Sequence, residues 1–310
     1  MGGAFLNFNG AATPYLCRLL PDGTKDSSFN LGTGINGKVY CSLIQPDGKI
    51  LLGGSFTLFN SQTTNRLLRL NTDGSLDVTF NTTIASSSGV IYSLALQSDG
   101  SIIIGGSFTN YNGNNVTRIA RILPNGNLDS TFVTGTGANG IIYSIQIQSN
   151  GKIILGGSFT LFNGILSNKI IRLNADGSND VTFVTGTGFD DDIKTLVVQT
   201  DGRILIGGDF TKYNDLTNNR ILRLNDDGSI DVSFIAGLGF SNGGVSVIKI
   251  STIGSIILGG SFTGTYDGIE VNRLVLLEPN GVINLTFDSG SGPSSGTVLT
   301  IAPELSGSWY

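Results

Sequence analysis

The feature that most constrains this chain is a pair of adjacent glycines that returns at a nearly constant spacing. The pairs begin at Gly2, Gly53, Gly105, Gly156, Gly207 and Gly259, so the period is 51 or 52 residues. Self-similarity at a fixed period is typical of repeat architectures, in which each unit buries its apolar face against its neighbours. The sequence therefore predicts six copies of one structural unit in 310 residues.

One unit is read most clearly between Ile91 and Phe132. Its apolar runs cover residues 91–97, 101–108, 117–123 and 127–132. Turns at Ser98-Asp99-Gly100 and Pro124-Asn125-Gly126 lie at two of the three connections between them. Asp-Gly and Asn-Gly between apolar runs are strong hairpin signals, and no run of a dozen residues has a helical period. We therefore expect four short antiparallel strands in each unit.

Four-stranded units repeated along a chain are typical of propeller blades. We predict an all-β fold, a six-bladed β-propeller that forms a single domain over residues 1–310. Residues 306–310 occupy the part of the repeat that directly precedes Met1. We therefore expect the N- and C-terminal segments to close the ring within one blade. The alternative is that these ends pair between neighbouring chains.

Composition excludes several classes of function. The formal charge is −5 and the basic residues are scattered, whereas a nucleic-acid binder presents a basic patch. There is no histidine, which excludes Ser–His and Cys–His nucleophilic schemes. The sequence has no run of about twenty apolar residues, so we expect no membrane insertion. We also expect Cys17 and Cys41 to remain unpaired.

Two long motifs carry a family resemblance. Arg69 to Phe80 reads RLNTDGSLDVTF, and Asp47 to Phe56 reads DGKILLGGSF. Repeated over essentially the whole chain, they resemble the delta-sixty repeat, a propeller-type repeat of unassigned biochemical role. The sixth copy departs from it, with Leu276 for the Arg and Asn284 for the second Asp. The resemblance implies a propeller from a bacterial surface protein or a phage tail-type protein, and hence a virion or cell-surface location.

The Arg and the second Asp of this motif change together. Both are present in five copies and both are absent from the sixth. This indicates an ion pair inside each blade rather than a ring of arginines around a substrate. The predicted pairs are Arg18–Asp26, Arg69–Asp77, Arg121–Asp129, Arg172–Asp180 and Arg223–Asp231.

Strand direction indicates which side of the blades can bind a ligand. The first and third connections of a blade share one side and are short Asx-Gly turns. The second connection and the crossing to the next blade share the other side and carry the variation, and binding residues usually lie on such loops. The candidate binding residues there are Asn36, Lys38, Asn139, Phe189, Asp190, Asp191, Asp192, Phe240 and Asn242.

The aromatic candidates are distinguished by recurrence. Phe59, Tyr111, Phe162 and Tyr213 occupy one repeat position, and we interpret them as packing residues. Phe189 and Phe240 match only each other, so we expect them to form a contact surface.

Two motifs bear on cofactors. Asp190, Asp191 and Asp192 form an acidic run found in one repeat only, a candidate for a divalent cation such as calcium; the alternative is a solvated acidic loop. Residues 32–37 and 135–140 match G-x-G-x-x-G. A strand follows each, whereas a dinucleotide site needs a helix. We expect no cofactor, with calcium as the alternative.

Three functions follow. The first is a non-enzymatic interaction or structural module, a component of a phage particle or surface assembly, whose partners are other proteins. The second is a lectin-like propeller that binds surface glycans, with or without calcium. The third is a glycoside hydrolase with paired carboxylates, but the three glutamates, Glu270, Glu278 and Glu304, show no partner in the sequence.

Overall fold

A computed structural model describes residues 1–64, 66–80, 89–290 and 292–301. The chain forms two compact units. Unit 1 comprises Met1–Ile147, Phe162–Gly164 and Asp176–Ser178, and unit 2 comprises Gln148–Leu161, Ile165–Ala175 and Asn179–Tyr310. The described residues contain strands and no helix, so no helix among them can span a membrane. The expected all-β class is confirmed.

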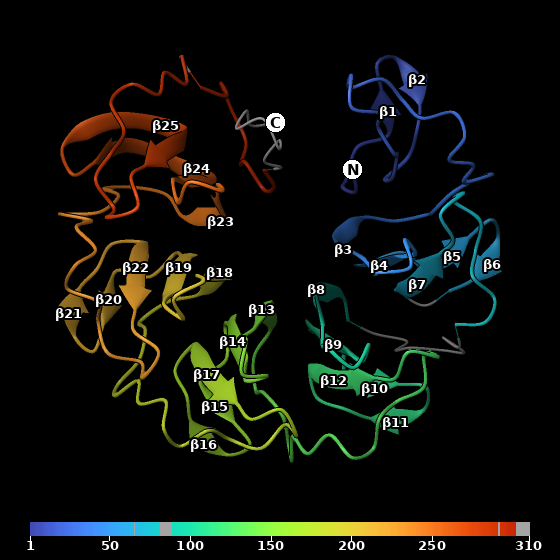
Figure 1. The fold of residues 1–310 in the computed structure, drawn as a ribbon, viewed down its shortest axis with the longest axis horizontal. Helices are drawn as coiled ribbons and strands as arrows, with labels where there is room; N and C mark the ends of the chain where they lie inside the picture. Colours follow the sequence, from blue (N-terminus) through green and yellow to red (C-terminus); the bar gives the residue numbers. More distant parts are fainter. Residues whose placement is uncertain (65, 81–88, 291, 302–310) are drawn as a thin grey trace. The chain divides into compact units, whose positions relative to one another are not determined.

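Short strands follow one another throughout unit 1 (Figure 1). They are β1 (Asn7–Phe8), β2 (Ala11–Ala12), β3 (Val39–Ile44), β4 (Ile50–Gly54), β5 (Leu58–Phe59), β6 (Gln62–Thr63), β7 (Leu67–Leu70), β8 (Ile91–Leu96), β9 (Ile102–Gly106), β10 (Asn110–Tyr111), β11 (Asn114–Asn115), β12 (Ile119–Ile122) and β13 (Ile142–Ile147).

The strands that follow continue the same succession. They are β14 (Ile153–Gly157), β15 (Leu161–Phe162), β16 (Ile165–Leu166), β17 (Ile170–Leu173), β18 (Ile193–Val198), β19 (Ile204–Gly208), β20 (Lys212–Tyr213), β21 (Leu216–Thr217), β22 (Ile221–Leu224), β23 (Val245–Ile250), β24 (Ile256–Tyr266) and β25 (Ile269–Leu277).

The strands form small antiparallel sheets of three. In unit 1 the orders are β3-β4-β7 and β8-β9-β12, and in unit 2 they are β18-β19-β22 and β23-β24-β25. The middle strand is apolar along its whole length, and every residue of β9 and β19 is buried. A strand covered on both faces has this continuous apolar pattern. The glycine pair therefore lies on the middle strand of each three-stranded sheet.

The predicted fourth strand is reduced to a single bridge, such as Ile122↔Leu128. The reason is the second Asp of the motif. Asp77 Oδ1 accepts hydrogen bonds from the Thr79 backbone N–H at 3.0 Å and hydroxyl at 2.6 Å, and Phe80 N–H donates to Asp77 O. These bonds fold the backbone into a turn, which ends the strand. The larger of the described sheets therefore have three strands rather than four.

The second connection contains more structure than the predicted loop. Two-residue strands pair there as β5–β6 and β10–β11 in unit 1 and as β20–β21 in unit 2. In the β23-β24-β25 sheet the same hairpin merges with its neighbours, so that β24 and β25 are 11 and 9 residues long.

The glycine pairs are required by a close approach of the backbone. A Cβ on Gly54 would lie 2.1 Å from Lys38 O, and one on Gly106 would lie 1.9 Å from Val90 O. Both carbonyls belong to the segment that enters β3 or β8. The pairing has a β-bulge at the same place, between Val39 and Cys41 and between Ile91 and Ser93. In these sheets the glycine pair thus lies where the backbone of the crossing approaches the middle strand.

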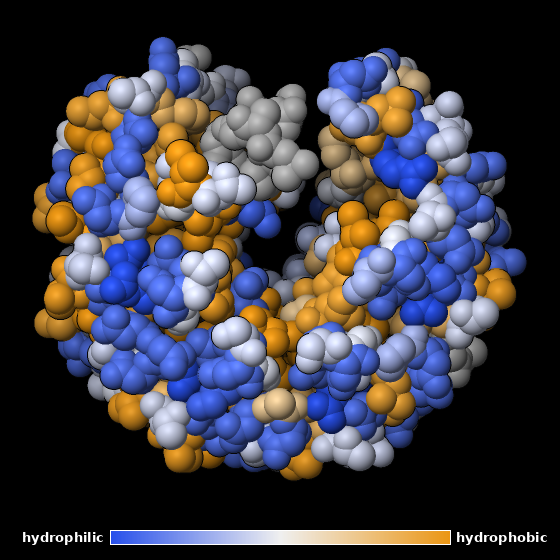
Figure 2. Space-filling model, in the orientation of Figure 1, coloured by the Kyte–Doolittle hydropathy of each residue, from blue (hydrophilic) through white to orange (hydrophobic). Residues whose placement is uncertain are grey.

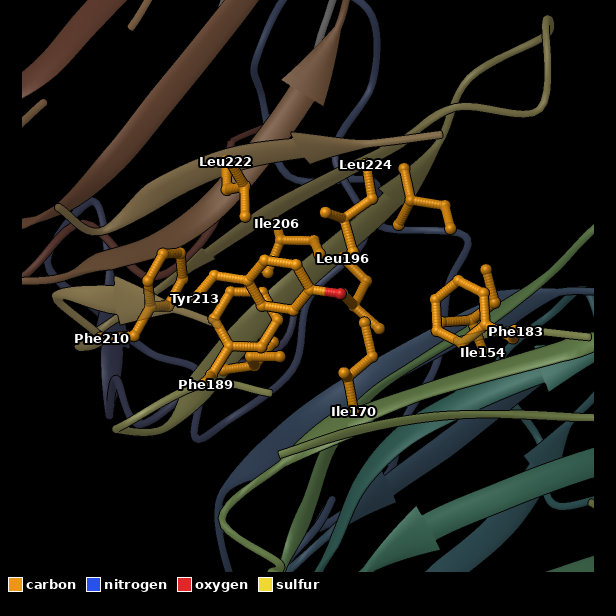
Figure 3. Packing of buried hydrophobic residues seen from close by; sticks show 12 residues of the cluster. Ile154, Ile170, Phe183, Phe189, Leu196, Ile206, Phe210, Tyr213, Leu222 and Leu224 are labelled. Atoms are coloured by element: carbon orange, nitrogen blue, oxygen red, sulfur yellow. The ribbon is translucent and has the colours of Figure 1, made fainter. Parts of the chain in front are cut away.

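Each unit has its own apolar core. In unit 2, Tyr213, Phe210 and Leu196 lie among the apolar residues of β19 and β22 (Figure 3). The Tyr213 hydroxyl donates to Gly228 O at 2.6 Å, and that of Tyr111 donates to Gly126 O at 2.7 Å in unit 1. Together with Phe59 and Phe162, these side chains are almost completely buried. Their predicted packing role is confirmed.

Isolated apolar side chains lie among hydrophilic ones at the surface of both units (Figure 2). Val78, Val181 and Val232, which directly follow the recurring Asp, are 83%, 81% and 91% exposed. Single exposed apolar residues are common on soluble proteins. Both cysteines are unpaired, as expected. The predicted strand closure involves residues 306–310, which lie outside the described residues.

Candidate functional site

The recurring Arg and Asp form the ion pair that the sequence predicted. Arg69 Nε lies 2.7 Å from Asp77 Oδ2, and the same contact occurs in the other four copies. The Arg69 guanidinium also lies 4.5 Å from the Phe80 ring centroid and donates from Nη1 to Pro124 O at 2.8 Å. Because Pro124 belongs to the next repeat, this arginine joins two repeats as well as β7 and the turn that follows it.

The carboxylates of these pairs are held in the charged form. Burial alone would raise the pKa of Asp77, but hydrogen bonds from Lys49, Thr79 and Arg69 outweigh it and lower the pKa below the usual range. The pKa of Asp180 is lowered by an equivalent set of bonds. A general acid needs a raised pKa near the working pH, so the lowered pKa values of these carboxylates do not suit that role.

The candidate binding residue Asn36 caps the backbone of the second connection. Its Oδ1 accepts from Thr57 N–H and Leu58 N–H, both at 2.8 Å. Asp190 makes the same contacts in unit 2, with Thr211 N–H at 2.8 Å and Lys212 N–H at 2.9 Å. These two candidates therefore have a structural role even though both residues are exposed.

The acidic run does not converge on one point. The Asp190 side chain binds the second connection, while Asp191 Oδ1 accepts from Asp192 N–H at 2.7 Å. Asp192 lies 2.9 Å from Lys194 Nζ and 3.7 Å from Lys169 Nζ. No group of three or more metal-ligating side chains is present in the described part of the chain. The predicted metal candidates thus stand close in sequence but face different partners.

The prediction that Phe189 and Phe240 form a contact surface is wrong. They are only 3% and 0% exposed. The Phe189 ring lies 4.6 Å from the rings of Phe210 and Tyr213 (Figure 3), and Phe240 packs on Phe262 and Tyr266.

The physical reason is a bridge from each crossing to the second connection, Phe189↔Tyr213 and Phe240↔Tyr266. Ile35 and Ala138 occupy the same position in unit 1 and are buried too. The alignment of these four apolar residues was the signal that could have revealed the burial.

The remaining candidates are exposed. Lys38 and Asn139 lie in the crossings that enter β3 and β13 in unit 1. Asn242 lies before β23 in unit 2, and its amide donates to the Thr263 hydroxyl at 3.3 Å. Three of the candidates therefore belong to unit 1 and come just before β3 or β13, namely Asn36, Lys38 and Asn139.

Strands β3, β8 and β13 carry a row of tyrosines that the sequence reasoning missed. Tyr40 on β3 and Tyr92 on β8 have ring centroids 5.0 Å apart at an interplanar angle of 61°. Tyr92 and Tyr143 on β13 follow at 5.4 Å and 66°. The signal in the sequence was one repeat position with Tyr in three successive copies, and Lys194, Ser246 and Leu299 in the others.

A pocket of about 610 Å³ opens in unit 2 beside β24 and β25. Glu270 is the single carboxylate among its described lining residues. The Arg273 guanidinium at its wall already donates to Pro293 O and Gly296 O. Glycoside hydrolysis usually needs two carboxylates on either side of the scissile bond, which this pocket does not supply.

Comparison with protein families gives one match, to a model described as a domain of unknown function (DUF5122) beta-propeller. It matches six segments that together cover more than half of the chain, residues 1–29, 45–80, 97–132, 148–183, 199–234 and 254–287. The chain belongs to the DUF5122 β-propeller family. Comparison with curated proteins gives no match.

Several solved structures resemble this DUF5122 protein at low identity. One is a protein of unknown function from Bacteroides caccae, with 13% identity, 80% coverage of each chain and a TM-score of 0.43. A virginiamycin B lyase from Staphylococcus aureus has 15% identity, 90% and 74% coverage and a TM-score of 0.48. A gluconolactonase from Xanthomonas campestris has 13% identity, 77% and 73% coverage and a TM-score of 0.42. None of these likenesses bears on what this chain binds.

The DUF5122 match divides the chain in a way that separates scaffold from candidate site. The Arg, Asp and Phe of the structural unit, and the glycine pairs, lie inside the matched segments. The tyrosine row and all nine candidate binding residues fall in the intervals between them. These intervals contain the crossings and the strands that follow them, β3, β8, β13, β18 and β23, where this chain differs from one repeat to the next.

Proposed function

We propose that this chain is a non-enzymatic interaction module, a component of a phage particle or a surface assembly, that binds through the side carrying the crossings. The observation that supports this best is the separation just described. Recurring residues inside the matched segments hold the strands together, while the tyrosine row and the nine candidate binding residues lie between those segments. Variable loops on a repeated scaffold are the usual place for recognition.

The state of the ionisable groups supports a binding rather than a catalytic role. The described recurring aspartates have lowered pKa values and accept hydrogen bonds from their own repeats. Glu278 accepts a hydrogen bond from the Asn284 amide at 2.8 Å. A hydrolase would instead use a carboxylate with a raised pKa near a second one.

The finer architecture is part of the same proposal. The six matched segments and the constant period favour delta-sixty blades, six in number, that close into one domain over residues 1–310. Class averages from electron microscopy of the purified chain would show six sectors. Five sectors, seven sectors or an open stack would overturn this architecture.

A photo-crosslinking experiment tests the function. A benzophenone amino acid at Lys38, on the crossing side, is compared with one at Asp99, in an exposed first-connection turn. In the native host, we expect Lys38 to give discrete adducts with a protein or glycan of the virion or cell envelope and Asp99 to give none. Adducts from Asp99 alone, or from neither position, would refute the proposal.

Glycan binding is the second candidate function, and the tyrosine row favours it. Tyrosine presents an apolar ring with a polar end, which suits a sugar with C–H faces and hydroxyl groups. If glycans are the partners of the assembly, the row is the feature expected to contact them. Calcium assistance would require carboxylates other than those engaged by Lys169 and Lys194.

A further inference from the structure

We propose that Tyr40, Tyr92 and Tyr143 form the binding site for a linear oligosaccharide of neutral pyranose sugars. This inference rests on the proposed binding function and names its ligand class. The three rings form one continuous row, because each neighbouring pair makes an edge-to-face contact. Adjacent strands fix the row. The Ser93 hydroxyl of β8 accepts from Ile145 N–H of β13 at 3.0 Å, and Cys41 Sγ of β3 contacts Ile91 O of β8.

The tyrosines lie outside the core. Tyr40 is 45% exposed and the other two are half-buried. In contrast, Val39, Ile91 and Ile142, each directly before a tyrosine, are 5%, 2% and 0% exposed. In each of these three copies a buried residue thus precedes a less buried tyrosine, so the strand packs one side chain into the core and leaves the next at least partly accessible.

A β-bulge places the Tyr40 and Tyr92 rings in this position. In β3, Val39 pairs with Gly54 and Cys41 pairs with Gly53, so Tyr40 is the extra residue of the bulge. Tyr92 has the same place between Ile91 and Ser93. An extra residue is left unpaired in the ladder and its side chain is redirected, which is why bulges are frequent next to active sites.

The fold itself does not require an aromatic ring at this bulge. In unit 2 the same irregularity is present between Ile193 and Thr195 and between Val245 and Val247. The extra residues there are Lys194 and Ser246. The bulge therefore accommodates lysine and serine as well as tyrosine, so the row of three rings follows from the side chains of unit 1 and not from the backbone.

The surroundings of the row are polar. Asn36 and Lys38 precede Tyr40 by four and two residues, and Asn139 precedes Tyr143 by four. All three are exposed in the crossings that lead into β3 and β13. The Asn36 side chain is engaged with Thr57 and Leu58, so Lys38 is the candidate donor to a sugar hydroxyl while a ring covers the C–H face. A small number of polar groups among aromatic ones is the usual composition of a small-ligand site.

The size of the row favours an oligosaccharide over a folded protein. A stable protein interface buries about 800 Å² on each partner, whereas one fully buried aromatic side chain contributes only about 150–250 Å². Three partly buried rings in a single file offer less than a protein interface needs. A row one ring wide and three rings long instead matches an extended chain of small cyclic units.

A glycan array tests the proposal, followed by titration calorimetry with cellohexaose, maltohexaose and chitohexaose as probes. We expect the wild-type chain to bind neutral glycans. Tyr92→Ala, in the middle of the row, should lower affinity at least tenfold, and Tyr92→Phe should stay within about threefold because the ring remains. Ser246→Ala changes the same bulge position in unit 2 and should leave affinity unchanged. Far-ultraviolet circular dichroism verifies that each variant is folded.

The outcomes separate this proposal from the broader one. An array without neutral-glycan binding, or equal affinity for folded Tyr92→Ala and wild type, would overturn the glycan site. If Lys38 still crosslinks to a protein in that case, the interaction module stands and the site alone is wrong. Binding of a proline-rich peptide that Tyr92→Ala abolishes would assign the row to peptides and also overturn the glycan site. Hydrolysis of a bound hexasaccharide would overturn the non-enzymatic function.

Discussion

Replacement of Asp77 by Asn gives a sharp test of the ion pair that joins successive repeats. The Asp77 carboxylate, with a side chain 4% exposed, lies 2.7 Å from Arg69 Nε and 2.8 Å from Lys49 Nζ. Asn can still accept the bonds from Thr79, as Asn284 does from Thr286 in the sixth repeat. The variant therefore removes the charge and keeps the turn. Removal of one partner from a buried pair costs about 3–5 kcal/mol, and we expect a loss of that size.

Two comparisons make the expected loss specific. Asp129→Asn is the matched control, because Asp129 pairs with Arg121 in a more exposed setting and Ser101 replaces the lysine; its loss should be smaller, about 1–2 kcal/mol. The double variant Arg69→Leu with Asp77→Asn reproduces the Leu276 and Asn284 of the sixth repeat. It should be less destabilised than the sum of the single variants, because it leaves no unpaired guanidinium.

Urea unfolding followed by circular dichroism at pH 7 measures these differences, with the slope of the transition checked for each variant. A loss below about 1 kcal/mol for Asp77→Asn would show that the pair adds little stability. Equal losses for Asp77→Asn and Asp129→Asn, or strictly additive losses in the double variant, would also refute the reasoning.

Three further predictions follow from the same contacts. The folded-state pKa of Asp77 lies below its usual value, so the stability that its charge contributes is complete above the unfolded pKa of about 4 and is lost as the pH falls. The difference in free energy of unfolding between wild type and Asp77→Asn should therefore narrow in urea titrations from pH 6 to pH 3. A constant difference would contradict this. Gly106→Ala places a Cβ 1.9 Å from Val90 O, whereas Gly113 lies at positive φ and has nothing within 4 Å of such an atom. The melting temperature should fall far more for Gly106→Ala, since Gly113→Ala carries only about 1–2 kcal/mol of backbone strain. Similar falls for the two variants would be the contrary result. Asp190→Asn should hardly change the free energy of unfolding, because Asn36 makes the same bonds in unit 1. Asp190→Ala should lower that free energy by about 1–2 kcal/mol in chemical unfolding. A large loss for Asp190→Asn would show that the charge of Asp190 matters.

The places where the sequence reasoning failed have a common physical origin. The candidate Phe189 was misplaced because its burial depends on a bridge to Tyr213, 24 residues later in the chain. The tyrosine row was missed because a side chain at a bulge does not follow the alternation of a regular strand. The fourth strand was overestimated because Asp77 folds the backbone through its side chain, which strand propensity does not anticipate.

The repeat, the all-β class and the five Arg–Asp pairs could all be inferred from the amino-acid sequence, because each depends on residues that recur at constant spacing. Asx-Gly turns and glycine pairs act through local backbone sterics, and such effects can be recognised in the sequence of any copy of the repeat. Which of the varied residues are buried and which are exposed could not be inferred in this way, because it depends on the folded chain. Burial of Phe189 and exposure of Tyr40 depend on the register between strands distant in the chain, and a shift of one residue moves a side chain from the core to the surface.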